Sequence, residues 1–265
     1  MISRLPGLSL PERAWGVVRR WALAWWRILY LGAVVCVLVL SPSSYGKVTR
    51  RALARHLYLD TAPVLLGFTV LAALISLVLT RIVIVTAISY GLSRYALEMV
   101  IRVLVLELIP LTAALFVAMR CTIPNGTQLA LLRQSGHLAR LSHAGADPIR
   151  VELLPRAVAG VFACITLAAL SCVVALVLAY LGVYGFSLAG LPSYTRMFGH
   201  VFAPAVTLVF VIKTVLFSLA VALIPMAAGL YDTGERTQPD SELGGLARMF
   251  AVLLLIETAS LMGNY

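Results

Sequence analysis

The stretch Pro155–Gly182, which reads PRAVAGVFACITLAALSCVVALVLAYLG, decides the class of this protein. Beyond Arg156 it contains no charged residue. Its length exceeds the roughly 20 residues that an α-helix needs to cross a hydrocarbon core about 30 Å thick. The stretch therefore predicts a transmembrane helix.

The composition of the whole chain agrees with this prediction. The 265 residues have a mean hydropathy of +0.97 and only 12% of them are charged, which lies outside the range of soluble globular domains. A formal net charge of +10 is typical of cytoplasmic loops and of contacts with anionic headgroups. Because the basic residues flank apolar segments, we expect no nucleic-acid binding. The composition predicts an all-α membrane protein with no separate soluble catalytic module.

Five apolar stretches predict membrane crossings. The first exceeds one span, which indicates a bent or tilted helix. The stretches are Asp60–Tyr90, Met99–Met119, Pro155–Gly182, Ala203–Leu230 and Gly245–Leu261. The sequence thus divides into an N-terminal region, residues 1–59, and a transmembrane domain, residues 60–265.

The N-terminal region combines tryptophans with arginines. Trp15, Trp21, Trp25 and Trp26 alternate with basic residues over a helical stretch, a mixture that suits an amphipathic helix in the membrane interface. The apolar run Ile28–Leu40 that follows has thirteen residues, which is short for a crossing. We expect it to be half-embedded, and a full crossing is the alternative.

The distribution of Lys and Arg predicts the orientation in the membrane. With a cytoplasmic N-terminus, sixteen of these residues lie inside and four outside, which satisfies the positive-inside rule. Five crossings then put the C-terminus on the outer side of the membrane. The sixteen are Arg4, Arg13, Arg19, Arg20, Arg27, Lys47, Arg50, Arg51, Arg55, Arg120, Arg133, Arg140, Arg150, Arg156, Arg236 and Arg248, and the four are Arg81, Arg94, Arg102 and Arg196.

Metal and nucleotide chemistry have no support in the sequence. The four cysteines lie in or beside apolar segments without CxxC spacing, and the four histidines are scattered, so we expect no metal site. No G-x-x-x-x-G-K-[ST] motif is present, so the chain itself is expected to hold no cofactor and to be no enzyme. Any ATP hydrolysis would therefore have to come from a partner subunit, which would bind the ATP and Mg²⁺.

A basic stretch, Met119–Arg156, separates the second and third predicted crossings. Its Pro124-Asn125-Gly126 predicts a turn, and Gln128–Ala144 has helical spacing. Arg133, His137 and Arg140 then fall at i, i+4 and i+7 on one face. This helix either rests on anionic lipid or docks into a cytoplasmic partner. Asp147-Pro148 predicts an N-cap and first turn for the helix that follows.

Two opposite charges lie within predicted crossings. Lys213 and Glu257 are placed at depths that differ by about 6 Å at a rise of about 1.5 Å per residue, within reach of a lysine side chain. An ionisable group at mid-bilayer costs about 3 kcal/mol or more unless it has a partner or faces water. The pair is either a salt bridge that joins two helices or a site that meets a lipid headgroup.

Three segments resemble the MlaE family, the permease subunits of MCE-associated ABC transporters that move phospholipid. They are LELIPLTAALFVAMR, GADPIRVELLPRAVAGV and VFVIKTVLFSLAVA, and they carry the family's pattern without gaps as Glu107-Leu108-Ile109-Pro110, Arg120, Asp147-Pro148, Pro155-Arg156 and Ala159-Gly160. The resemblance covers roughly residue 53 to the C-terminus.

The resemblance implies a homodimeric permease of the bacterial inner membrane that moves phospholipid or a related lipid and supports outer-membrane lipid asymmetry. It implies an interfacial helix, five transmembrane helices and a cytoplasmic coupling helix. The implied partners are two ATPase subunits, a periplasmic MCE hexamer and a small cytoplasmic regulatory subunit. The residues expected at the ATPase contact are Arg133, His137 and Arg140, from their spacing on one face, together with the motif residues Arg120 and Asp147.

The same resemblance implies a lipid cavity where two protomers join. Lys213, Glu257 and Glu107 match charged family positions, with Arg102 as a compensating charge for Glu107. Tyr90 matches a family tyrosine near the cavity, and Leu79 lies on the same helix. The outer segment Pro192–Phe202 either faces the MCE ring or re-enters the membrane.

The chain also departs from the family pattern. Gln128-Leu129-Ala130 stands where the family has Glu-x-Gly, Gly136 and Ser142 replace two acidic residues, and Leu106 replaces an Arg. The expected coupling helix is therefore more basic than the family's. These departures leave open a divergent member with another lipid substrate, or a scaffold that anchors an MCE assembly without transport.

Overall fold

The computed structural model describes residues 10–41, 46–231 and 239–264. Within these ranges every regular element is helical and no strand occurs, which confirms the prediction of an all-α protein. Arg4 and Arg236 of the charge count lie outside the described residues, as does Tyr265.

Ten α-helices are joined in part by short π-helical turns within the described ranges. The α-helices are α1 (Leu10–Leu40), α2 (Lys47–Ser89), α3 (Ser93–Val100), α4 (Ile109–Val117), α5 (Ile123–Gln134), α6 (His137–His143), α7 (Leu154–Tyr184), α8 (Leu191–Val201), α9 (Pro204–Tyr231) and α10 (Pro239–Asn264). The π-helical turns are η2 (Ile101–Leu108), η3 (Ala118–Thr122) and η4 (Ile149–Leu153), and η5 (Leu188–Gly190) is a 3₁₀ turn.

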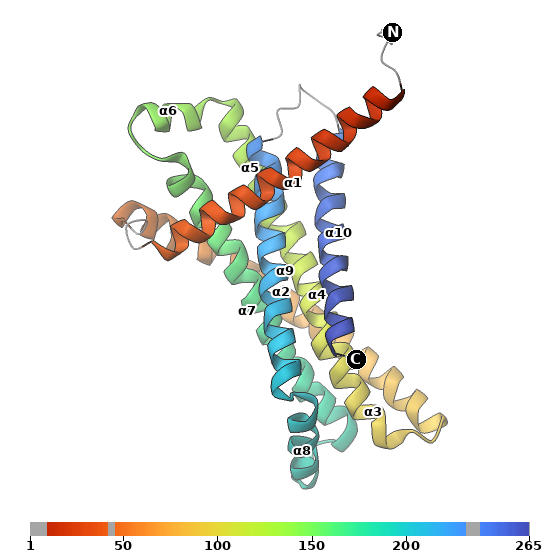
Figure 1. Cartoon of the computed structure of the whole chain (residues 1–265). Helices are drawn as coiled ribbons and strands as arrows, with labels where there is room; N and C mark the ends of the chain where they lie inside the picture. Colours follow the sequence, from red (N-terminus) through yellow and green to blue (C-terminus); the bar gives the residue numbers. More distant parts are fainter. Residues whose placement is uncertain (1–9, 42–45, 232–238, 265) are drawn as a thin grey trace.

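The long helices form one bundle. Helices α7 and α9 pack on each other, α2 packs along α7, and α10 packs along α9. Figure 1 shows α1 and α6 at one end of the bundle and α3 and α8 at the other, with the C-terminal end of α10 directed toward the α3 end. This is the relative sidedness that five crossings require.

Small side chains allow the central helices to approach closely. Ala159, Ala163 and Ala168 of α7 are buried, and Gly160 faces Thr122 and Ala222 so closely that a Cβ there would lie 2.8 Å from Thr122 Cγ2. Small residues at helix contacts are typical of membrane bundles, where association depends on packing rather than on the exclusion of water. The alanine-rich pattern of the opening stretch therefore buries α7 among its neighbours.

Each π-helical turn precedes a proline by two residues. Pro110 follows η2, Pro124 follows η3 and Pro155 follows η4, and each proline stands in the first turn of the α-helix that comes next. A proline ring clashes with the carbonyl four residues before it, and local π-helical adjustment relieves this clash. The chain thus passes these prolines without a break in the helix.

This continuity corrects the predicted end of the second crossing. The sequence Pro124-Asn125-Gly126 is not a turn: it lies within α5, and Tyr95–Gln134 is one helical stretch of 40 residues. Arg120 lies in η3, inside this stretch, rather than at its end. The sequence interpretation ends the helix before Pro124, but the π-helical turn η3 leaves room for the proline ring and the helix continues.

Helix α1 is one uninterrupted helix rather than an interfacial helix followed by a separate apolar segment. Its second half packs Leu31, Val35 and Leu38 against α7 and α9. Six stretches of the described residues are long and apolar enough to span a membrane, and Trp21–Leu40 is one of them with 20 residues. In Figure 1 the helix crosses the end of the bundle obliquely instead of running along α9 and α10, as an interfacial helix would.

Two other elements differ from the sequence interpretation. The predicted boundary between residues 59 and 60 falls inside α2, which is continuous there. The outer segment Pro192–Phe202 is mostly helix α8, where Tyr194 packs against the core and its hydroxyl donates to the Leu176 carbonyl at 2.9 Å. Burial raises the pKa of Tyr194 to about 12.

Candidate functional site

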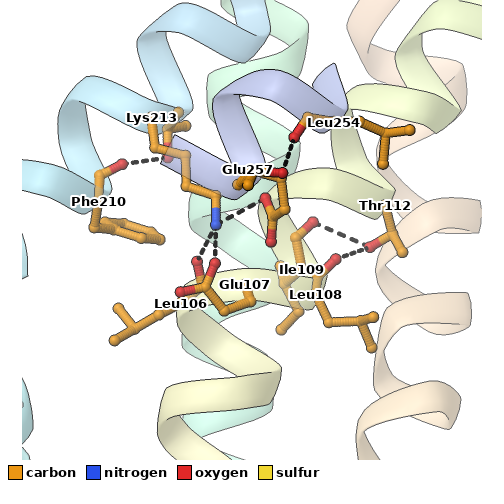
Figure 2. A network of polar contacts seen from close by, with 11 residues as sticks. Leu106, Glu107, Leu108, Ile109, Thr112, Phe210, Lys213, Leu254 and Glu257 are labelled. Carbon is orange, nitrogen blue, oxygen red and sulfur yellow. Dashed lines mark hydrogen bonds and ion pairs between the residues drawn. The ribbon is translucent and has the colours of Figure 1, made fainter. Parts of the chain in front are cut away.

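Three charged side chains converge in the middle of the bundle. Lys213 extends from α9 with only 2% of its surface exposed, and its Nζ donates to Glu107 of η2 and, at 3.2 Å, to the Leu106 carbonyl. Glu257 of α10 forms the other side, with its Oε2 2.9 Å from Lys213 Nζ. Figure 2 shows the lysine reaching between the two carboxyl groups. We call Lys213, Glu107 and Glu257 the charge cluster.

The charge cluster satisfies the lysine fully. An ammonium group has three N–H donors and no acceptor, and three oxygen atoms surround this one. The ring of Phe217 also lies 5.7 Å from Nζ, near enough for a cation–π contribution. Each of its three donors therefore has an oxygen partner inside the bundle.

The structure brings the predicted pair together and identifies Glu107 as a second partner of Lys213. Arg102 does not compensate Glu107, because its Nε lies 3.0 Å from Glu98 Oε1 one helical turn away. The charge cluster links η2, α9 and α10. Because Lys213 faces protein on all sides, a headgroup could reach it only after one of these elements moved.

Tyr90 and Leu79 lie outside the charge cluster. Tyr90 ends α2 and is 78% exposed. Leu79, earlier on α2, packs against the hydrophobic cluster that contains Leu106 and Ile109, two residues close to Glu107 in the sequence. Leu79 thus contributes to the packing of η2. In the described part of the chain no polar contact joins Tyr90 or Leu79 to Lys213.

A second set of contacts holds the opposite end of α9. Arg133 of α5 donates from Nη1 to the Leu230 carbonyl at 2.6 Å, and Arg27 of α1 donates from Nη1 to the Tyr231 carbonyl at 3.3 Å. The last carbonyls of a helix have no partner within it and carry partial negative charge, so cations stabilise them. Two arginines from different helices therefore cap α9 and fasten it to α5 and α1.

The predicted coupling helix Gln128–Ala144 is broken. Helix α5 ends at Gln134, Gly136 adopts a left-handed φ of 71°, and α6 starts at His137. Arg133 and Arg140 therefore do not share one helix face. A glycine tolerates positive φ at little cost, so Gly136 allows the chain to turn between the two helices.

The predicted coupling residues have separate surroundings. Arg140 is exposed and donates from Nη2 to the Ser135 carbonyl at 3.4 Å. His137 Nε2 lies 3.7 Å from Glu152 Oε1. Asp147 caps the next helix as expected, since its Oδ1 accepts from the Ile149 N–H at 3.0 Å. Arg120 is exposed on η3.

A polar group near α6 was missed from the sequence. Asn125 of α5 donates from Nδ2 to Asp60 Oδ2 of α2 at 3.0 Å, and Glu152 pairs with the buried Arg156. The first bond joins α2 to α5, and the contacts of Glu152 with His137 and Arg156 join α6 to η4 and α7. The signal was present: Asp60 and Asn125 are polar residues at the margins of long apolar stretches, where lone polar groups need partners.

Helices α5 and α9 touch backbone to backbone. A Cβ added at Gly126 would lie 2.6 Å from the Pro225 carbonyl oxygen, and one at Gly229 would lie 2.2 Å from the Gly126 carbonyl oxygen. Real side chains do not fit at such distances, so only glycine allows this crossing. With the charge cluster and the Arg133 cap, this crossing is a third contact between the Tyr95–Gln134 stretch and α9.

Comparison with known proteins agrees with this architecture. The sequence profile of the family described as Permease MlaE matches residues 53–261, which is well over half of the chain. A comparison with curated proteins gave no match. The matched region contains α2 from its first turns onward, the charge cluster and both glycines of the α5–α9 crossing. The chain is a multi-pass helical membrane protein, and it belongs to the MlaE permease family.

Proposed function

We propose that the protein is the permease subunit of an MCE-associated ABC transporter that moves phospholipid or a related lipid between the inner membrane and a periplasmic MCE ring. The family match over residues 53–261 carries this proposal. The chain acts as a homodimer, and ATP hydrolysis belongs to separate ATPase subunits. A small cytoplasmic regulatory subunit completes the assembly on the cytoplasmic side.

The arrangement of the bundle supports this assignment of partners. Basic residues gather at the end that carries α1 and α6, and by the positive-inside rule this end is cytoplasmic. The exposed Arg140 and the half-exposed His137 on α6 offer the ATPase a short docking element there. The opposite end carries α8, with Arg196 and His200 exposed toward the MCE ring.

The contacts between α5 and α9 support a path for mechanical coupling. A movement of α6 reaches α5 across the Gly136 joint. Helix α5 cannot slide freely past α9, because Gly126 meets Gly229 and Arg133 holds the Leu230 carbonyl. Since the same two helical stretches meet again at Glu107 and Lys213, the displacement arrives at the charge cluster. Lipid would then enter when α10, or a second protomer, moves away from the charge cluster.

Purification and lipid exchange test this function together. A tagged chain isolated from its native membrane should retain an ATPase subunit and an MCE protein. Reconstituted into vesicles with fluorescent phospholipid, the complex should extract lipid only with hydrolysable ATP. An assembly with an MCE protein but no ATPase would instead identify a scaffold, and the glycine break at Gly136 would then mark a lost coupling helix.

A further inference from the structure

An arginine interrupts the exposed apolar side of the 43-residue helix α2. Arg81 lies within Thr49–Ser89, a stretch long and apolar enough to span a membrane, and its side chain is exposed. At about 3.6 residues per turn, large apolar residues share this side of α2 before and after Arg81. These exposed residues are Leu74, Leu77, Val78, Ile82, Val85 and Ile88. A guanidinium therefore lies in a surface that otherwise suits lipid tails.

Arg81 makes no hydrogen bond or ion pair with any residue that the structure describes. The residues three and four positions away, which could pair with it along the helix, are all apolar. They are Leu77, Val78, Ile84 and Val85. Arg102 at the same end of the bundle is different, since its Nε lies 3.0 Å from Glu98 Oε1, one helical turn away. Within the described chain, Arg102 thus has a carboxylate beside it and Arg81 has none.

A second copy of the chain does not supply this anion either. Toward the α3 end of the bundle the carboxyl groups are those of Glu98, Glu107 and Glu257, and each contacts Arg102 or Lys213. The other eight of the eleven acidic residues lie on the cytoplasmic side in the predicted topology. They are Glu12, Asp60, Asp147, Glu152, Asp232, Glu235, Asp240 and Glu242. The anion for Arg81 must therefore come from another kind of molecule.

The depth of Arg81 indicates which molecule this is. Arg81 lies eight positions before the end of α2 at Ser89, or about 12 Å at a rise of about 1.5 Å per residue. Tyr90 and Tyr95 are exposed just beyond this end, and exposed tyrosines are typical of headgroup level. Arg81 thus lies somewhat below the headgroups. An arginine at such a depth stays charged by reaching toward the interface and by drawing phosphate and water inward.

We propose that Arg81 binds the phosphate of an outer-leaflet phospholipid, at a site on the exposed side of α2. The planar guanidinium can donate two parallel hydrogen bonds to a phosphate, and the apolar residues around Arg81 suit the acyl chains. The site lies apart from the charge cluster. Leu79 and Val83, each two positions from Arg81, pack toward the core that contains Leu106, so Arg81 is on the opposite side of the helix.

Binding at this site requires neither an ATPase nor transport, so it stands or falls independently of the proposed function. A headgroup held by Arg81 would lie below the plane of the leaflet. The same phosphate chemistry occurs in all phospholipids, so the site selects phospholipid over lipids without phosphate and does not select one headgroup.

Photo-crosslinking of the purified full chain in nanodiscs of phosphatidylglycerol tests the site. A small fraction of phosphatidylethanolamine carries a diazirine on its amine, close to the phosphate. Mass spectrometry should locate headgroup adducts on residues 77–85 of the wild-type chain. Arg81→Gln should lower their yield about tenfold, because a charge-assisted contact with phosphate is lost. Arg81→Lys should give more adduct than Arg81→Gln, since it keeps the charge but not the planar fork.

Two controls separate a phosphate site from ordinary lipid contact. Arg196→Gln removes an exposed arginine of α8 at the same end of the bundle and should leave the adducts on α2 unchanged. A diacyl glycolipid with the same diazirine and no phosphate should label residues 77–85 no more than the phospholipid labels Arg81→Gln. This comparison of two lipids uses the wild-type chain, so it decides even if a variant fails to fold.

Two results would overturn the proposal. Equal adduct yields from wild type and Arg81→Gln, or equal labelling by the glycolipid, would show that lipid covers α2 without binding to Arg81. Crosslinks from a photoreactive residue at Val85 to a second copy of the chain, with no lipid adduct, would instead assign this side of α2 to a protein interface.

Discussion

Lys213 on α9 and Glu257 on α10 meet with 2.9 Å between Nζ and Oε2, although 44 positions separate them in the chain. Glu107, from a third element, reaches the same nitrogen. The lysine thus joins three parts of the bundle at one point. Removing the lysine alone should therefore cost more stability than removing all three charges.

The first prediction concerns the whole cluster. Lys213→Met should lower the stability of the purified protein by about 3–5 kcal/mol, because it leaves two buried carboxyls without a counter-charge. The triple variant Lys213→Met, Glu107→Gln and Glu257→Gln should recover most of this loss, since uncharged groups of similar size replace the charges. Denaturant unfolding in detergent measures both. Equal stability of Lys213→Met and wild type would show that the cluster does not stabilise the bundle.

A second prediction separates transport from packing in the same cluster. The exchange Lys213→Glu with Glu257→Lys preserves the net charge but loses the contact with the Leu106 carbonyl. The double variant should transport lipid faster than either single variant, and more of it should be recovered as assembled complex. If the exchanged pair is no better than the single variants, position rather than charge balance is decisive at this site.

The third prediction distinguishes Arg133 from Arg140. Arg140 is exposed, so Arg140→Glu should weaken ATPase binding about tenfold, or about 1.4 kcal/mol, through repulsion at the interface. Arg133→Gln should instead destabilise the permease by about 1.5–3 kcal/mol, because it removes a charged donor from the end of α9. Arg140→Lys is the control and should bind normally. Full ATPase retention by Arg140→Glu would exclude α6 as the docking element.

The fourth prediction uses matched glycines. Gly126→Ala should separate α5 from α9 and cost roughly 1–3 kcal/mol, since its Cβ would lie 2.6 Å from a backbone oxygen. Gly67→Ala on α2 meets nothing within 4 Å and should be neutral or stabilising by up to about 1 kcal/mol. Thermal unfolding and ATP-dependent transport of the two variants make the comparison. An unaffected Gly126→Ala would mean that the helices can part without loss.

The fifth prediction concerns topology. In a chain whose exposed Cys36 is replaced by serine, a cysteine at Ser135 should react with a membrane-impermeant thiol reagent only from the cytoplasm. A cysteine at Phe186, the most exposed large apolar residue near α8, should react only from the periplasm. The remaining cysteines are buried and should stay silent. Labelling of both positions from one side would contradict five crossings between a cytoplasmic N-terminus and a periplasmic C-terminus.

The apolar runs and their flanking charges were sufficient to predict the helices that form the bundle. Length and hydropathy constrain a membrane helix strongly, because the bilayer thickness is fixed and the backbone must satisfy its own hydrogen bonds. The approach of Lys213 to Glu257 was also predictable, since two opposite charges at similar depth in an apolar medium have few other partners. These inferences needed only the order of residues.

Only the tertiary structure shows which helices continue past a proline and which side chains cap the helix ends. The sequence Pro124-Asn125-Gly126 suggests a turn, yet a preceding π-helical turn gives the proline ring room and the helix runs on. Arg133 looked like a surface residue by periodicity, but it caps the end of α9, a helix nearly one hundred positions away. For the same reason, Glu107 pairs with Lys213 and not with Arg102. Local pattern gives the face on which a side chain lies, whereas its partner depends on which helices pack together and on the gap that their small residues leave between them.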